Sequence, residues 1–274
     1  MRLRISHSTT YQYDPPATGV IQVLRMTPGN HDGQYVANWQ VDVTTDAKLV
    51  MHHDAFGNIT HTFTHGTVSD LTVHVAGQVE TQDTGGILRG SVERFPPSLF
   101  LRTTPLTGAD TAMRKMAAQM HEESEGNALD FLHGLLLQLN EYMAFDPDPT
   151  NTGTSAIEAF TLRRGVCQDY AHTFIALARA VGVPARFVSG HFYREDADMA
   201  QEAGHAWAEA YVSGLGWVGF DPANGISPTD AHVRVAIGLD YLGAAPVRGT
   251  RYGGGAETLS VAVQVDQARR QSQN

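Results

Sequence analysis

The stretch that decides the fold is Gly165-Val166-Cys167-Gln168-Asp169-Tyr170-Ala171-His172, which contains the one cysteine of the chain. Apolar residues recur at helical spacing from Cys167 through Phe174 to Val181, so we expect a buried helix that begins at the cysteine. A lone cysteine is more often a small buried hydrophobic residue. At a helix start, however, free backbone N–H groups and the helix dipole favour a negatively charged thiolate. The position therefore makes Cys167 a candidate nucleophile.

Two later strands carry the partners that a nucleophilic thiol requires. His205 begins an alternating segment that reaches Val212, and Asp221 directly follows the next segment, Trp217 to Phe220. If these segments pair as an antiparallel hairpin with Gly214 at its apex, Asp221 lies within diagonal reach of the His205 ring. Thiol acyl transfer needs a nucleophile, a base and an orienting carboxylate, and the order Cys, His, Asp supplies them.

These segments together resemble the transglutaminase-like superfamily of cysteine proteases and acyltransferases. The first ninety residues, with His7, Thr9 and Tyr11, are similar to the β-rich region that precedes this core in a bacterial subgroup. The resemblance implies Cys167 as nucleophile, His205 as base and Asp221 as orienting residue. It leaves the reaction open, because the superfamily includes cross-linking enzymes, peptidases, amidases, deglycosylating enzymes and inactive scaffolds. The resemblance rests on residues 165–172, 182–186, 204–207 and 216–222 in that order.

Four further residues are candidates for substrate binding or for positioning the reacting groups. Gln168 and Trp207 adjoin the predicted nucleophile and base, and His191 lies on the strand that follows the helix. Arg164 is a candidate partner for an acidic substrate group, although an arginine before a helix is more often solvated. His172 lies five residues along the helix from Cys167, which turns it away and favours a packing or capping role.

The oxyanion site is only partly predicted. The backbone N–H of Cys167 is the expected first donor to the oxyanion. A papain-like enzyme usually has a glutamine shortly before the nucleophile, whereas residues 160–166 read Phe-Thr-Leu-Arg-Arg-Gly-Val. The second donor therefore stays unassigned.

The chain is predicted to be an α+β protein with an N-terminal antiparallel β-sandwich-like domain and a papain-like core of helices packed on an antiparallel sheet. We expect a β-rich domain over 1–95, a catalytic core over 96–256, and a terminal strand with a frayed tail over 257–274. Alternating residues predict strands, apolar residues at i, i+3, i+4 and i+7 predict helices, and Ser155 to Glu158 forms a capping box. The predicted segments are strands at 5–13 (ending at Asp14-Pro15-Pro16), 39–43, 71–75, 185–193 and 259–265, an irregular connection at 83–105, helices at 113–120 and 132–143, and a loop at 194–198.

Composition and charge exclude several classes of protein. The 19 basic and 29 acidic residues give a net charge of −10, and no basic run is present, so a nucleic-acid partner is not expected. The apolar stretches are shorter than the roughly 20 residues that cross a bilayer, and the N-terminal residues lack the apolar core of a secretory leader, so we expect a cytoplasmic protein without membrane contact. The cluster His52, His53, Asp54, His61 and His65 lacks a recognised metal-ligand spacing.

The predicted activity is thiol-dependent hydrolysis of a peptide or isopeptide amide through an acyl-cysteine intermediate, with no cofactor or metal. Hydrolysis is preferred to cross-linking because the sequence has no obvious acyl-acceptor feature and no run of calcium ligands. Two alternatives stay open: transglutaminase-type transfer to an amine, and a non-catalytic binding module with the same fold. The sequence indicates no oligomeric state.

Overall fold

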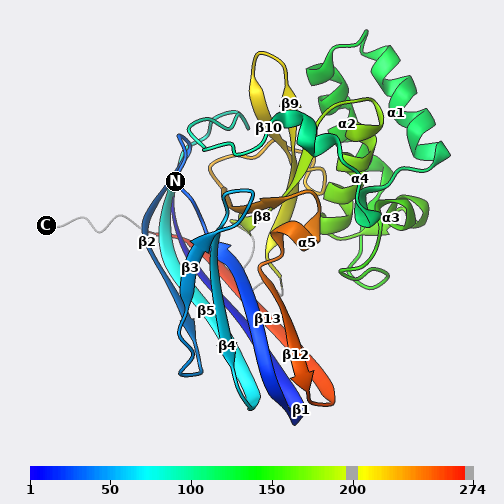
Figure 1. The fold of residues 1–274 in the computed structure, drawn as a ribbon. Helices are drawn as coiled ribbons and strands as arrows, with labels where there is room; N and C mark the ends of the chain where they lie inside the picture. Colours follow the sequence, from blue (N-terminus) through cyan, green and yellow to red (C-terminus); the bar gives the residue numbers. More distant parts are fainter. Residues whose placement is uncertain (196–202, 269–274) are drawn as a thin grey trace, which may run out of the picture.

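The computed structural model describes residues 1–195 and 203–268, and it contains a long-stranded N-terminal sheet and a helix-covered core (Figure 1). This arrangement confirms the predicted α+β class. Most of the predicted loop at 194–198 and the end of the predicted frayed tail lie outside the described residues.

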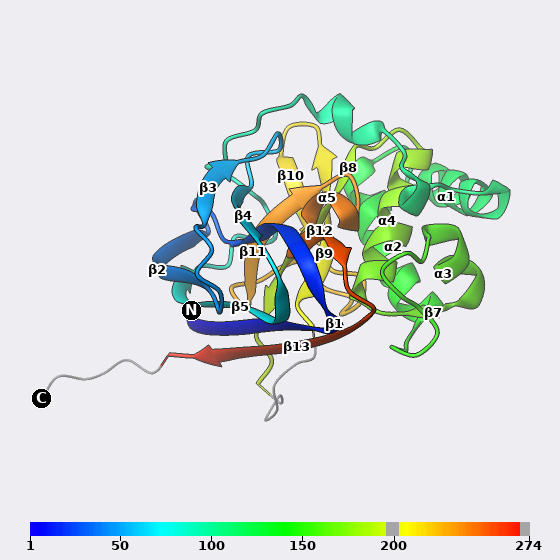
Figure 2. The same cartoon turned by 60° about the horizontal axis from the view of Figure 1, so that its bottom comes forward.

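The N-terminal sheet has seven antiparallel strands organised around one very long strand. Their hydrogen-bonded order is β2-β5-β1-β4-β3, and two C-terminal strands also pair with β1. Figure 2 shows the last strand, β13, running beside β1. The strands are β1 (Arg2–Thr27), β2 (Gln34–Val43), β3 (Val50–His53), β4 (Ile59–His65), β5 (Val68–Thr81), β12 (Val247–Gly253) and β13 (Ala256–Gln267).

The predicted strand end at Asp14-Pro15-Pro16 is wrong, because β1 continues through it. Proline has no N–H to donate and is tolerated in a strand only where the ladder does not need that donor. Here the register with β13 ends at Asp14 and the register with β12 begins at Ala17. The two prolines lie between these pairings, so the missing donors break no ladder hydrogen bond.

The core consists of helices packed on a second antiparallel sheet of order β10-β9-β8-β11. Its long central helix, α4, is buried along nearly its whole length among the other helices and the sheet. The predicted capping box is present, with the Ser155 hydroxyl accepting from the Glu158 N–H and Glu158 accepting from Ser155. The elements are η1 (Pro97–Leu101), η2 (Pro105–Thr107), α1 (Thr111–Glu123), α2 (Ala128–Tyr142), β6 (Ala144–Phe145), α3 (Ala156–Leu162), β7 (Arg164–Gly165), α4 (Cys167–Ala180), β8 (Ala185–Phe192), β9 (His205–Val212), β10 (Gly216–Phe220), β11 (His232–Gly238) and α5 (Tyr241–Ala244).

The β9–β10 hairpin has the predicted register. Gly216 pairs with Val212, and Phe220 pairs with Ala208. A tight turn fixes the pairing of two strands with little freedom, because a shift by one residue would move every side chain to the other face. The hairpin therefore carries Asp221, the first residue after β10, to the end of the sheet where β9 begins with His205.

Strand β11, the edge strand that faces the N-terminal sheet, was not predicted from the sequence. Its backbone is held by two side-chain amides of the N-terminal region. Gln34 accepts from the Arg234 N–H and donates to the Arg234 carbonyl, each at 2.8 Å. Asn58 does the same at Ile237, with both hydrogen bonds again 2.8 Å long. These four bonds satisfy an edge that would otherwise be left unpaired, and they fix the core against the N-terminal sheet.

The chain returns to the N-terminal sheet earlier than the predicted boundary at 256. Strand β12 lies inside the predicted 96–256 core, yet it pairs with β1 from Ala17 to Leu24. Strand β13 pairs with the first half of β1. The N-terminal sheet is thus completed by the last strands of the chain, which adds a second connection between the two regions.

Replacing Asn58 by Ala is predicted to destabilise the protein by about 2 kcal/mol, because the buried N–H and carbonyl of Ile237 lose their partners. Urea unfolding of the variant and the parent protein measures the change. The matched control is Asn38→Ala at an exposed position of β2. Equal stability of the Asn58 variant and the control would contradict a role for Asn58 in holding β11.

Candidate active site

The first turn of α4 is fixed by a hydrogen-bonded carboxylate. One oxygen of Asp169 accepts from the Val166 N–H and from the Thr150 hydroxyl, each at 2.8 Å. A side chain at Gly165 would collide with this carboxylate, so the chain needs glycine there. These contacts start the helix at Cys167, as predicted. The N–H groups of the first helical turn have no partner within the helix and remain available to an anion.

His205 lies between the thiol and a carboxylate. Its Nε2 is 2.7 Å from Oδ2 of Asp221. A hydrogen bond between the Cys167 and His205 side chains is among the interactions that favour the charged imidazole. Because Nε2 is engaged by Asp221, Nδ1 is the nitrogen left to face the sulfur. The structure thus brings together the three side chains that the sequence analysis selected.

Electrostatics keep the His205 ring charged at neutral pH. Burial alone would lower the pKa of His205, but the charge of Asp221 and its hydrogen bond outweigh burial and, with Cys167, raise that pKa to about 10. For Asp221, burial would raise the pKa, yet the interactions with His205 and His232 hold it well below its usual range. The pair is therefore an imidazolium and a carboxylate in a buried setting, where charge interactions are strong.

His232, on β11, is a neighbour of Asp221 that the sequence analysis missed. Its Nδ1 accepts from the Thr229 N–H at 3.1 Å, which leaves the proton of the neutral ring on Nε2. That Nε2 is 3.2 Å from Oδ2 of Asp221 and donates to it. Burial, the largest influence, lowers the pKa of His232, so the ring is neutral. The Asn224 amide donates to the same oxygen at 2.7 Å.

The same cluster is the candidate for metal binding among residues 1–195 and 203–268. Ligand atoms of His205, Asp221 and His232 lie within 4.8 Å of one another. Both histidines direct Nε2 at a single carboxylate oxygen, so a cation placed among them would displace two existing hydrogen bonds. We therefore interpret the cluster as a hydrogen-bonded support for His205.

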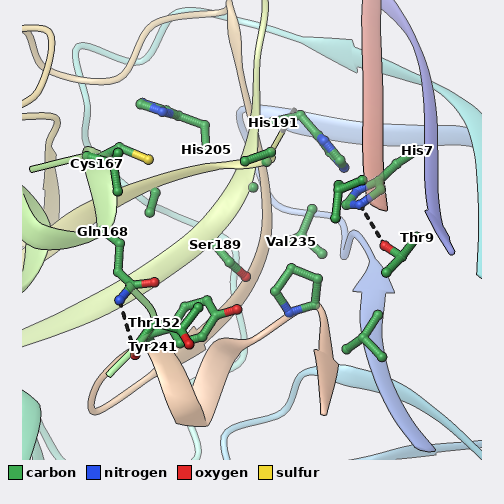
Figure 3. A pocket seen from close by; sticks show the side chains of 18 of the residues that line it. His7, Thr9, Thr152, Cys167, Gln168, Ser189, His191, His205, Val235 and Tyr241 are labelled. Atoms are coloured by element: carbon green, nitrogen blue, oxygen red, sulfur yellow. Dashed lines mark hydrogen bonds between the residues drawn. The ribbon is translucent and has the colours of Figure 1, made fainter. Parts of the chain in front are cut away.

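Cys167 and His205 line a cavity of about 620 Å³ between the core and the N-terminal sheet. Figure 3 shows these two side chains on one side of the cavity and His7 and Thr9 on the opposite side. Strands β1 and β13 of the N-terminal sheet contribute to its wall, together with residues of the core. The N-terminal region is thus part of the candidate site.

The structure separates the four predicted binding or positioning residues. Gln168 and His191 line the cavity, and the Gln168 amide is 3.4 Å from the Thr152 carbonyl. Trp207 is buried in the core, with its ring centre 6.0 Å from that of His205. Arg164 is not among the residues that line the cavity; its side chain is 63% exposed and pairs with Asp146.

The role predicted for His172 is confirmed. The residue is fully buried, and its Nε2 accepts from the Tyr241 N–H at 3.0 Å, which caps the start of α5.

Comparison with known proteins agrees with this architecture. The model of the transglutaminase-like superfamily matches residues 114–222, and the model of the bacterial transglutaminase-like N-terminal region matches residues 3–80. The chain belongs to the transglutaminase-like superfamily. The order of the two regions is the one that the resemblance implies.

The relatives include proteins of similar length and much longer proteins. "Uncharacterized protein ML0607" of Mycobacterium leprae is 29% identical, and the match covers 96% of this chain and 98% of that protein. A protein-glutamine gamma-glutamyltransferase of Pseudomonas aeruginosa is 31% identical over 44% of this chain and 20% of its own length. A solved structure from Cytophaga hutchinsonii, named a "Putative Cysteine Protease", has a TM-score of 0.77 at 20% identity and covers 97% of this chain and 90% of that chain. This last likeness shows the shared fold.

None of the helices in the described part of the chain combines the length and the apolar character needed to span a bilayer.

The raised pKa of His205 predicts a pH-dependent contribution to stability. A group whose pKa is higher in the folded protein stabilises it fully below its unfolded pKa, here 6.5, and loses that contribution as the pH rises toward about 10. In a Cys167→Ala background, where the thiol does not titrate, His205→Gln should remove on the order of 1–3 kcal/mol of pH dependence between about pH 6 and pH 9. Urea unfolding at both pH values measures it. Parallel stability curves for the two proteins would contradict a charged His205.

Proposed function

We propose that this protein is a thiol-dependent amide hydrolase, acting on a peptide or isopeptide bond through an acyl-cysteine intermediate. The observation that carries the proposal is the placement of Cys167, at a helix start, beside an imidazolium that the buried Asp221 carboxylate stabilises. An imidazolium and a helix N-terminus both favour the thiolate, which is the nucleophilic form of cysteine. Asn224 and His232 support this arrangement, because each donates a hydrogen bond to the same carboxylate oxygen.

The proposed reaction has two stages. The Cys167 thiolate attacks the amide carbonyl carbon, and the backbone N–H of Cys167 donates to the oxygen as negative charge develops there. When the C–N bond breaks, His205 gives its proton to the departing amine, which leaves a thioester and a neutral imidazole. His205 then takes a proton from water as that water attacks the thioester. The C–S bond breaks, the acid is released, and the thiolate and imidazolium are restored.

Acyl transfer to an amine is the second candidate reaction. It follows the same first stage, with an amine in place of water in the second stage. The named activity of the Pseudomonas aeruginosa relative favours it, although the match covers only 20% of that protein. A non-catalytic binding module is the third possibility. It is disfavoured because Cys167, His205 and Asp221 lie together and because His205 and Asp221 carry opposite charges. Cytoplasmic location and a peptide or amide partner remain predictions from the sequence.

The proposal is tested by trapping the acyl-enzyme from a panel of fluorogenic peptide and isopeptide substrates, with Cys167→Ala as the control. Mass spectrometry of the trapped protein identifies the acyl group. With a cleaved substrate, millimolar primary amine is predicted to divert only a minority of the acyl-enzyme from hydrolysis. If most of the product carries the amine at saturating concentration, transfer replaces hydrolysis as the assigned reaction. If no substrate gives Cys167-dependent product, the enzymatic proposal fails.

Asp221, which contacts His205, and His232, which contacts Asp221, should differ in their importance for activity. Asp221→Asn removes the charge that stabilises the imidazolium, so kcat/KM should fall on the order of a thousandfold or more, comparable to the effect of the same change in a serine protease triad. His232→Phe removes one neutral hydrogen bond to Asp221 and should cost about tenfold. Steady-state kinetics on the best panel substrate measures both. Losses below about threefold for Asp221→Asn would assign Asp221 to turn structure.

A further inference from the structure

Two polar side chains interrupt the apolar core-facing row of β1. Residues at alternate positions of a strand share one face, and this face begins with Leu3 and Ile5, both fully buried. The next two positions on it are His7 and Thr9, which are only 3% and 4% exposed. Their directly paired neighbours in the sheet offer no polar group, since all four are valines: Val75 and Val73 on β5, and Val263 and Val261 on β13.

These polar groups have few partners within the protein. His7 and Thr9 are hydrogen-bonded to each other, with Nε2 of His7 3.2 Å from the Thr9 hydroxyl. The His191 ring lies edge-on to His7 with ring centres 5.6 Å apart. His191 is 4% exposed, and its Nδ1 has no hydrogen-bond partner among the described residues. A buried polar atom without a partner is costly, so its presence calls for an explanation.

The three side chains line the same cavity as Cys167 and His205. In Figure 3, His7 and Thr9 lie across the cavity from the thiol, and His191 projects toward His7. The cavity is also lined by apolar groups from the core and from the chain at the start of β12, namely Phe187, Val235, Pro246 and Val247. The volume of about 620 Å³ is that of a pocket for a small organic group or a few peptide units.

Charge decides which group suits the far side of the cavity. Burial lowers the pKa of His7 to about 4 and that of His191 to about 3, so both rings are neutral at neutral pH. A neutral imidazole offers one donor and one acceptor, and the Thr9 hydroxyl offers both. Arg25, which also lines the cavity, is paired with Asp54 through its Nε at 2.9 Å, and its Nη1 has no hydrogen-bond partner among the described residues. Because both rings are neutral, they offer no charge to match a carboxylate or an ammonium bound beside them.

We propose that His7, Thr9 and His191 form a subsite that binds an uncharged amide in the acyl part of the substrate, across the cavity from Cys167. An amide offers both a donor and an acceptor, which matches the two neutral rings and the hydroxyl. The inference rests on the proposed function, because it assigns the substrate class of that same site. It also gives the N-terminal sheet a part in selecting the substrate.

Activated esters allow the preference of the subsite to be measured without cleavage of an amide bond. Release of p-nitrophenol from p-nitrophenyl esters reports acylation of Cys167 without a specific amide bond to cleave. Three kinds of ester are compared over a series of chain lengths: acetate, a linear acyl chain ending in a carboxamide, and the same chain ending in a methyl group. A fourth ester, ending in a carboxylate, tests whether Arg194 at the cavity wall draws an anion instead.

The parent protein should prefer the carboxamide ester to the methyl-terminated ester at the chain length that reaches the subsite. Thr9→Val should lower the ratio of kcat/KM for that ester to kcat/KM for the acetate ester about tenfold, since one hydrogen bond is lost. His191→Leu should act in the same direction. The matched control is Thr10→Val, the same substitution on the opposite face of β1, which should change neither ester. Because Thr9 is surrounded by valines, Thr9→Val should retain the stability of the parent protein in urea unfolding.

A binding measurement tests the amide subsite independently of the hydrolase proposal. Titration calorimetry of hexanamide into the Cys167→Ala protein should show binding that Thr9→Val weakens, whether or not any ester acylates the parent protein. Acylation by acetate with no carboxamide preference and no hexanamide binding overturns the subsite alone. Hexanamide binding without any acylation overturns the hydrolase proposal and retains the amide site. Preference for the carboxylate ester, or a loss of stability in Thr9→Val that accounts for its lower rate, also overturns the subsite.

Discussion

The buried carboxylate of Asp221 is the constraint on which the rest of the site depends. A fully buried negative charge is stable only when it is paired and hydrogen-bonded, and here His205, His232 and Asn224 all direct donors at one of its oxygens. Each donor comes from a different element of the fold: β9, β11 and the turn after β10. The position of His205 beside Cys167 therefore depends on the core sheet, including its edge strand β11.

The N-terminal sheet, which lies outside the core, helps to hold the residues around Asp221 in place. Gln34 and Asn58 satisfy the backbone of β11, the strand that carries His232, and β1 supplies the wall opposite Cys167. The return of β12 and β13 to β1 closes the arrangement from the C-terminal side. The two regions matched by separate family models thus form one structural unit around a shared cavity.

Local signals were enough to predict much of the core. Helical spacing after Cys167 located α4, and one tight turn fixed the β9–β10 register that brings Asp221 to His205. Long-range pairing was not readable from the sequence, so the edge strand β11 and with it His232 were missed. The same limit applies to β12, whose partner β1 lies at the other end of the chain. The exposure of Arg164 agrees with the more common case noted from the sequence, in which an arginine before a helix is solvated.

The central claim is that His205, held charged by Asp221, keeps Cys167 in its nucleophilic form. The rate at which iodoacetamide alkylates the native protein at neutral pH tests this claim most directly, because Cys167 is the one thiol of the chain. We expect the native protein to be alkylated faster than the unfolded chain, and the His205→Ala variant to be alkylated more slowly than the parent protein. Native alkylation no faster than that of the unfolded chain, or a native rate that His205→Ala leaves unchanged, would contradict the claim.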